Sequence, residues 1–341
     1  MTDEHSNNGV VLTVEDLRTV FDVEGGTVRA VDGAGFAVRR GEILAIVGES
    51  GCGKSVTAYS VLRLIQPPGR IEGGRIRLHG GNDDETLDIL SLDEKDERLF
   101  HIRGGRISMI FQEPMTALSP VHTIGNQICE AILLHQDVTP AAAEGAAVAM
   151  LAKVGIPGAE RCLKRYPHEL SGGMRQRAVI AMALVCRPEL LIADEPTTAL
   201  DVTIQAQILR LIKQLQADLG MAVLLITHDI GVVAQTAQRV AVMYLGRIVE
   251  QAPVRDLITS PRHSYTHGLL QSLPGLHTGG RRLQSIRGSL PGPLARPAGC
   301  PFHPRCDRAV AGRCDVGDPP ALRRIAPGRD VACVLAQEDD L

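Results

Sequence analysis

The stretch ILAIVGESGCGKS, Ile43–Ser55, decides the fold. Its first five residues are apolar without interruption, which predicts a strand buried on both faces, as in a parallel sheet. Directly after this strand, Gly48, Gly53, Lys54 and Ser55 have the spacing of a phosphate-binding loop that opens a helix. Glycines let backbone N–H groups surround an anionic phosphate, and the helix N-terminus adds partial positive charge. The sequence therefore predicts an α/β fold with a phosphate site at this strand end.

Individual roles follow from the chemistry of the loop. Lys54 is expected to reach the β- and γ-phosphates of a nucleotide, and the Ser55 hydroxyl is expected to bind Mg²⁺. The backbone of the remaining loop residues is expected to surround the phosphates, and these residues are Gly48, Glu49, Ser50, Gly51, Cys52, Gly53 and Val56.

A second apolar strand ends in two carboxylates, in the stretch LLIADEP, Leu190–Pro196. Asp194 at the strand terminus is suited to hold Mg²⁺ through water. Glu195 beside it is suited to orient and deprotonate an attacking water molecule, the work of a general base. Such a stretch alone is weak evidence, and its value comes from its combination with the phosphate loop.

The stretch LSGGMRQR, Leu170–Arg177, supplies a second start of a helix that suits phosphate. Ser171, Gly172 and Gly173 offer a hydroxyl and backbone donors to phosphate oxygens. Because the chain already has one phosphate loop, this stretch predicts a second nucleotide contact. At this point the sequence resembles the ABC-type ATPases, in which the signature of one subunit closes on ATP held by the phosphate loop of the other.

Further motifs of that family occur in order, and the resemblance implies their roles. Gln112 resembles the Q-loop glutamine, a ligand of metal and water. Thr198–Asp201 resembles the D-loop, with Asp201 at its end. His228 resembles the switch histidine that contacts the γ-phosphate. Phe21 stands where an aromatic ring stacks on adenine in the family, although a core Phe is an equal alternative.

The resemblance implies a P-loop NTPase fold of the ABC ATPase kind. Its parts would be a RecA-like core, an antiparallel β subdomain, a helical subdomain and a small Cys-rich C-terminal extension. We place the nucleotide-binding domain at 1–262, with the helical subdomain at about 113–183, and the extension at 263–341. The boundary is set where Pro and Gly increase and periodicity weakens.

Local patterns predict several elements independently of the family. Strands are expected at 10–21, 35–47, 189–193 and 222–227, with a helix at about 203–219. A further helix is expected from Thr139, which can cap it, to the Gly155–Pro157 stop. Ser91 and Glu94 fit a capping box that opens a short helix.

Composition limits the class of protein. The 341 residues are 44% hydrophobic, so a large core is available, and Trp is absent. The net charge of −3 gives no global field that favours nucleic acid or anionic lipid. No apolar run approaches the ~20 residues that a membrane-spanning helix needs, and the first residues do not resemble a signal peptide. We therefore expect a cytoplasmic protein.

Four stretches narrow the resemblance to the ATP-binding subunits of dipeptide and oligopeptide importers. They are Phe111–Ile128, Tyr166–Arg177, Ser260–Pro274 and Gly299–Cys306. In the third, Ser264 stands where the family usually has Pro. The resemblance implies ATP and Mg²⁺ as cofactors and a second, homologous ATPase subunit as partner. The resemblance also implies two transmembrane permease subunits as partners and, indirectly, a solute-binding protein. This chain would lie peripherally at the cytoplasmic face of the inner membrane. Nickel and glutathione importers share much of the pattern.

Other classes of ABC ATPase fit less well. The DNA-repair type places a long coiled coil between the two phosphate motifs, and the interval Lys54–Glu169 has no heptad run. The ribosome type carries two cassettes in one chain, and this chain has one. We therefore expect no nucleic-acid partner. Intact Lys54, Glu195 and His228 argue against a regulatory subunit that does not hydrolyse ATP.

Four of the eight cysteines gather near the end of the chain as Cys300, Cys306, Cys314 and Cys333. Their spacing matches neither the common ferredoxin runs nor the paired cysteines of a zinc ribbon. Four thiolates would suit iron–sulfur or zinc, and His303 could replace one thiolate in a zinc site. Because the resembled family carries a comparable tail, sometimes with a cluster, we expect a [4Fe–4S] cluster, with zinc or no metal as alternatives.

Overall fold

The computed structural model describes residues 9–80, 86–112, 117–197, 201–272 and 286–336. The chain forms two compact units, each assembled from separate stretches of sequence. The helical unit consists of the described residues within Met1–Val11, Val38–Glu42 and Ser91–Leu225. The phosphate-loop unit consists of those within Leu12–Ala37, Ile43–Leu90 and Ile226–Leu341. The predicted domain division at residue 262 stays a prediction.

The helical unit combines a strand layer with a group of helices. Its strands follow the order β8-β7-β6, and β6 and β7 run parallel. The strands are β6 (Ile107–Ile110), β7 (Leu190–Asp194) and most of β8 (Ala222–Thr227). The helices are α2 (Glu97–Ile102), α3 (Ile124–His135), α4 (Pro140–Lys153), α5 (Ala159–Leu163), α6 (Gly172–Leu184) and α7 (Val202–Leu219), with a 3₁₀ turn at Pro167–Glu169.

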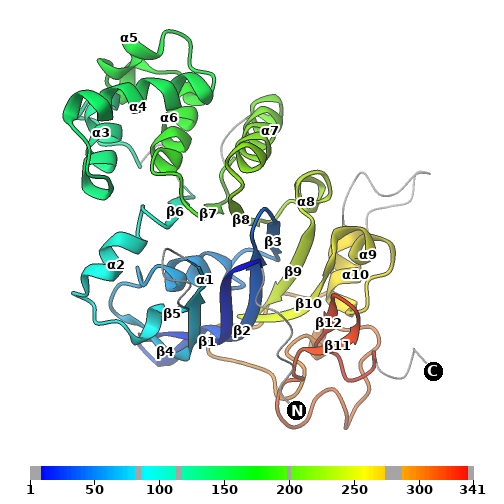
Figure 1. Cartoon of the computed structure of the whole chain (residues 1–341). Coiled ribbons are helices and arrows are strands. Elements are labelled where there is room, and N and C mark those ends of the chain that lie inside the picture. Colours follow the sequence, from blue (N-terminus) through cyan, green and yellow to red (C-terminus); the bar gives the residue numbers. More distant parts are fainter. Residues whose placement is uncertain (1–8, 81–85, 113–116, 198–200, 273–285, 337–341) are drawn as a thin grey trace. The chain divides into compact units, whose positions relative to one another are not determined.

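Helix α4 forms as its sequence predicts. The Thr139 side chain accepts a hydrogen bond from the Ala142 amide, Pro140 takes the first helical position, and Gly155 follows with φ +80°. The helix contacts α3, α5 and α6, and these four helices pack together in Figure 1. This confirms the helix predicted from Thr139 to the Gly155–Pro157 stop.

The phosphate-loop unit contains a four-stranded sheet in the order β2-β1-β4-β5. Strands β1 and β4 pair antiparallel, as do β4 and β5, which confirms an antiparallel β part. The strands are β1 (Val10–Val23), β2 (Gly26–Arg39), β4 (Gly69–Leu78) and β5 (Leu87–Asp88).

A second strand layer in the same unit carries the phosphate loop. Its order is β11-β12-β10-β9-β3, with β3 and β9 parallel and the others antiparallel. The strands are β3 (Ile43–Val47), β9 (Arg239–Tyr244), β10 (Arg247–Pro253), β11 (Arg323–Ala326) and β12 (Arg329–Val331). The helices are α1 (Lys54–Val61), α8 (Ile230–Thr236), α9 (Val254–Thr259) and α10 (Ser264–Gln271), with 3₁₀ turns at Ile89–Ser91 and His303–Arg305.

Two local predictions were wrong. The single strand expected at 35–47 is divided between β2 and β3, because Gly41, with φ +69°, turns the chain between them. Ser91 does not cap a helix. Helix α2 instead begins after Asp96, whose Oδ1 accepts a hydrogen bond from the Arg98 amide at 2.9 Å.

Strand β3 shows why the phosphate loop has a fixed base. All five of its residues are buried, as the uninterrupted apolar run predicts.

Among the described residues, no helix combines the length and apolar character that a membrane span requires.

Candidate functional site

The phosphate loop lies where two backbone segments leave no room for a side chain. A Cβ on Gly48 would lie 2.2 Å from the Met243 carbonyl oxygen, and a Cβ on Gly53 would lie 2.3 Å from that of Ala30. Gly53 also has φ +106°, which other residues rarely adopt. The two glycines of the predicted motif are therefore required by the packing of the loop itself.

Lys54 is held inside this loop. Its side chain is buried, and the Nζ atom donates to the carbonyl oxygens of Gly48 at 2.8 Å and Glu49 at 3.0 Å. The Cys52 sulfur lies 3.8 Å from the same Nζ. Burial raises the pKa of the Cys52 thiol, and the Lys54 charge offsets part of that rise. The loop thus keeps a cation at its centre, as a phosphate site needs.

Other loop residues divide between the tip and the base. Ser50 and Gly51 are exposed at the tip, while Ser55 and Val56 are half-buried in the first turn of α1. Glu49 is bound from the far end of the chain, since Arg305 contacts both of its carboxylate oxygens. The Glu49 carboxylate raises the pKa of Arg305, so this guanidinium keeps its charge.

Phe21 lies near the end of β1 and is half-buried. Its register partner in β4 is Gly69, where a Cβ would lie 2.5 Å from the Phe21 ring. The ring therefore covers a glycine on the neighbouring strand. Its predicted role in stacking on adenine stays a prediction.

The predicted carboxylates lie in the helical unit. Asp194, the last residue of β7, is fully buried, and Glu195 follows with φ +45°. A positive φ on a glutamate is uncommon and costs free energy, about 1–3 kcal/mol, which is typical of functional sites. The Gln112 Nε2 donates to the Glu195 Oε2 at 3.3 Å. The structure thus brings together two residues that the sequence placed 83 positions apart.

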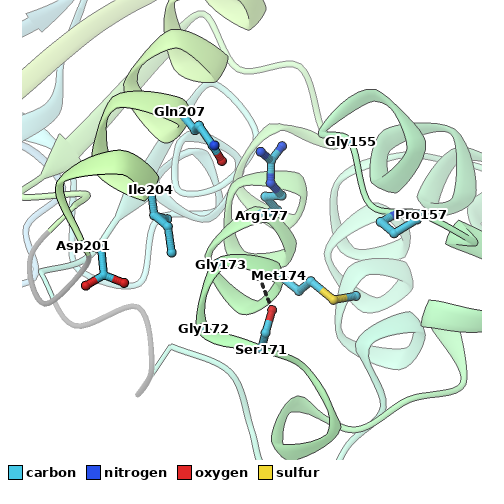
Figure 2. A pocket seen from close by; sticks show the side chains of 10 residues that line it. All are labelled: Gly155, Pro157, Ser171, Gly172, Gly173, Met174, Arg177, Asp201, Ile204 and Gln207. Carbon is cyan, nitrogen blue, oxygen red and sulfur yellow. Dashed lines mark hydrogen bonds between the residues drawn. The ribbon is translucent and has the colours of Figure 1, made fainter.

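Ser171 begins α6 at the edge of an open cavity in the helical unit. The cavity has a volume of about 670 Å³, and Figure 2 shows the side chains around it. The Ser171 Oγ accepts a hydrogen bond from the Met174 amide at 3.4 Å, as a helix cap. Gly172 and Gly173 also line the cavity, and so does Asp201 at the start of α7. Thr198–Leu200, the rest of the predicted D-loop, lie outside the described residues.

Gln176 is a site residue that sequence reasoning missed. It is buried in α6, and its Nε2 donates to the Pro196 carbonyl oxygen at 2.6 Å. This bond connects helix α6 with the residue after Glu195. The sequence signal that could have revealed Gln176 is its place as a polar residue on the buried side of helix α6.

His228 belongs to the phosphate-loop unit. It follows β8 directly and is exposed. The next residue, Asp229, caps α8 by accepting a hydrogen bond from the Val232 amide at 3.2 Å. The histidine therefore lies on a short turn between a buried strand and a capped helix, and its contact with a γ-phosphate stays a prediction.

The four clustered cysteines line one small cavity of about 20 Å³, together with His263 and His303. All four are free thiols. The pKa of Cys300 is raised to about 11, mainly by burial and further by the charges of the other three thiols. The described residues nevertheless contain no group of three or more His, Cys, Asp or Glu side chains arranged to hold a metal ion.

Comparison with known proteins identifies two family regions. Residues 31–198 match the ABC transporter family, and residues 249–314 match the oligopeptide/dipeptide transporter C-terminal region. The chain is 53% identical to a probable peptide ABC transporter ATP-binding protein of Sinorhizobium fredii, over 96% of each protein. It is 49% identical to the dipeptide transport ATP-binding protein DppD of Bacillus subtilis, over 94% of this chain and 91% of the relative.

Solved structures agree with this assignment. An ATP-binding cassette solved as a dimer in a post-hydrolysis state with ADP and phosphate matches with a TM-score of 0.61 and 25% identity. The match covers 72% of this chain and 99% of that cassette. The mixed α/β sheets described above are therefore those of the ABC ATPase fold. The chain belongs to the ABC transporter family, among the ATP-binding proteins of peptide transport, and it is an ATPase of that family.

Proposed function

We propose that this chain is the ATP-hydrolysing subunit that powers import of dipeptides or oligopeptides across the cytoplasmic membrane. The observation that carries the proposal is that one chain contains two helix N-termini suited to bind an anion. One is the loop Gly48–Ser55 around Lys54, and the other is the Ser171 cap beside an open cavity. The relatives named above supply the substrate class, since their names specify peptides and dipeptides.

The phosphate loop is proposed to hold the nucleotide. Backbone amides of Gly48–Ser55 would face the phosphates, and Lys54 would turn its Nζ from the loop carbonyls to the phosphate oxygens. This exchange needs little rearrangement, because the ammonium group already lies within the loop.

Three oxygen-bearing side chains suit Mg²⁺ by their chemistry, namely the Ser55 hydroxyl, the Gln112 amide and the Asp194 carboxylate. The place of Asp194 at the carboxyl end of β7, which runs parallel to β6, supports this role, because ligands bind at the carboxyl ends of parallel strands. Bound Mg²⁺ would supply neutralisation of the charge that develops on the phosphates.

Glu195 is proposed as the general base. Its carboxylate would accept a proton from the attacking water, and the Gln112 amide holds that carboxylate in place through the bond described above. His228 is proposed to contact the γ-phosphate. The strained backbone at Glu195 supports a functional role, because such strain persists where the surroundings impose it.

Hydrolysis is proposed to require a second ATPase subunit. Ser171, Gly172 and Gly173 border a cavity open to solvent, which supports their binding the phosphates of a nucleotide carried by a partner. The dimeric cassette that this chain resembles provides the precedent. We propose a head-to-tail pair in which the partner is a homologous ATPase.

The membrane partners are proposed to be two permease subunits, supplied by a solute-binding protein outside the cell. Three large apolar side chains of the helical unit support such a contact, because Val121, Leu133 and Leu134 are 74%, 44% and 51% exposed. Leu133 and Leu134 also line an open cavity of about 480 Å³ along α3. The chain would then lie peripherally at the cytoplasmic face of the inner membrane.

The cysteine-lined cavity is proposed to bind a [4Fe–4S] cluster. Four free thiols on one cavity support this choice. Burial, and to a smaller extent the other three cysteines, raises the pKa of Cys300, and a bound cation would stabilise the thiolate form. The present 20 Å³ is about the size of one water molecule. A cluster would therefore require the cysteine side chains to turn outward. A single zinc ion would also require them to move, because the described residues contain no group arranged to hold a metal ion.

The first test concerns the transported substrate. In cells that depend on this chain, replacement by the Glu195→Gln variant should abolish uptake of labelled dipeptides or oligopeptides, while the variant protein still accumulates. Uptake of nickel and of glutathione is measured in the same cells. Loss of nickel or glutathione uptake with peptide uptake intact would assign the substrate to those compounds instead.

The second test separates binding from hydrolysis. Glu195→Gln should lower ATP turnover by ~10²–10⁴-fold while ATP binding survives, because a general base is lost. Lys54→Ala should instead weaken ATP binding by about 10- to 100-fold, as expected for one charge-assisted contact. Turnover of Glu195→Gln within about twofold of wild type would remove this residue from the role of base.

The third test concerns assembly. The isolated chain should hydrolyse ATP slowly, with a specific activity that rises with protein concentration, because one phosphate loop and one signature in a chain serve different sites. Turnover and sedimentation are measured on the same dilution series. Full activity that does not depend on concentration, in a monomeric sample, would contradict the head-to-tail pair.

The fourth test concerns the cysteines. Protein purified without exposure to air should contain iron and acid-labile sulfide, and both should fall sharply in Cys306→Ser. Cys129→Ser, which changes a half-buried cysteine of α3, serves as the matched control and should retain both. Zinc at one ion per chain with no sulfide would reject the cluster.

A further inference from the structure

We propose that Arg305, in the cysteine-rich segment, is a positioning residue of the nucleotide site, because it neutralises Glu49 and fixes the phosphate loop. This inference rests on the proposed role of Gly48–Ser55 in binding ATP. Nothing in the motifs of the loop requires a residue 256 positions away, yet the structure places one against it.

The contact is bidentate and partly buried. The Arg305 Nη1 lies 2.7 Å from the Glu49 Oε2, and its Nη2 lies 3.0 Å from Oε1. The Arg305 side chain is only 4% exposed. Two parallel bonds between a guanidinium and a carboxylate fix direction as well as distance. Glu49 therefore has one orientation rather than the several that an exposed glutamate would adopt.

Arg305 is itself held in place. Its Nε donates to the Arg287 carbonyl oxygen at 3.0 Å, and its Nη1 lies 3.5 Å from the Tyr244 hydroxyl. Tyr244 packs with Phe302, at a ring separation of 5.3 Å. Because the guanidinium is bound on several sides, it acts as a fixed support and not as a mobile surface charge.

A second contact joins the same loop residue to the C-terminal half of the unit. The Glu49 amide donates to the Tyr265 hydroxyl at 2.9 Å, and the Tyr265 side chain is fully buried. Its ring lies 4.6 Å from that of Tyr244 and 5.3 Å from that of Phe302. The backbone and the side chain of Glu49 are thus anchored to one aromatic group, formed by Tyr244, Tyr265 and Phe302.

The part of the loop around Cys52 is supported by Arg296, which lies in the same C-terminal region as Arg305. Arg296 donates to the Asp32 carboxylate at 2.7 Å and to the Leu245 carbonyl oxygen at 3.0 Å. Leu245 precedes Gly246, whose amide donates to the Cys52 carbonyl oxygen at 2.8 Å. The segment from Arg296 to Arg305 therefore supports the loop at two places. Arg305 contacts Glu49 directly, and Arg296 acts through the turn that binds Cys52.

The charge of Glu49 explains why this support matters for binding. A carboxylate beside Gly48 repels a phosphate, and like charges in a partly buried site are screened less than in water. The Arg305 guanidinium cancels this repulsion. Without Arg305, the carboxylate would be both unneutralised and free to turn toward the bound phosphates.

The experiment measures nucleotide affinity by calorimetry with the full-length chain. Arg305→Ala should raise the dissociation constants of ATP and ADP by about tenfold, as for one charge-assisted contact. Adding Glu49→Gln to Arg305→Ala should recover most of the loss, because the repelling carboxylate is removed. Arg324→Ala is the matched control, since Arg324 lies in the same C-terminal region but pairs with Asp330 at an exposed site.

Three further outcomes decide between explanations. Unchanged ATP affinity in Arg305→Ala, with binding lost in Lys54→Ala, would overturn the role of Arg305 and leave the nucleotide site intact. Unchanged affinity in Lys54→Ala would reject the nucleotide site itself. If Arg305→Ala and its combination with Glu49→Gln lose affinity equally, Arg305 does not act by neutralising Glu49, and the proposal fails. Arg305→Lys, which keeps the charge without the bidentate geometry, should lie between wild type and Arg305→Ala.

Discussion

Backbone crowding around the phosphate loop is the constraint on which the phosphate-loop unit depends. Strand β9 reaches Gly48 through the Met243 carbonyl, and β2 reaches Gly53 through the Ala30 carbonyl. The turn between β9 and β10 closes the same space, because a Cβ on Gly246 would lie 2.6 Å from the Ala30 oxygen. The loop therefore takes its shape only when strands from early and late parts of the chain are assembled around it. This is why the N-terminal strands and the C-terminal region belong to one unit.

The helical unit connects helix α6 with Glu195, the residue proposed above as the general base. The Gln176 amide binds the Pro196 carbonyl, one residue after Glu195, and Gln112 binds the Glu195 side chain. A buried amide that loses its partner costs about 1–3 kcal/mol, so the buried Gln176–Pro196 bond resists being broken. The Gln176–Pro196 bond thus joins α6 to the backbone one residue after Glu195.

The sequence predicted what depends on local pattern. Strands β3 and β7, helix α4 and the phosphate loop follow from apolar runs, caps and glycine spacing over short stretches. The break at Gly41 and the cap at Asp96 were missed, because spacing alone does not show which of several turn residues the fold uses. Arg305, Tyr265 and Gln176 could not be predicted, since their contacts join distant parts of the chain. The roles of Phe21 and of the four cysteines depend on bound groups and stay predictions.

The cap at Ser171 has a consequence for the polarity of its hydroxyl group. A hydroxyl carries one proton and two lone pairs, and the Met174 amide occupies a lone pair. The proton is then left to point away from the helix, toward an acceptor. Aspartate and asparagine cap helices as well as serine does, but aspartate would present a negative charge at this position and threonine would add a methyl group. Helix stability alone would thus accept several residues here, whereas the proposed contact with a nucleotide phosphate would favour a small neutral donor such as serine.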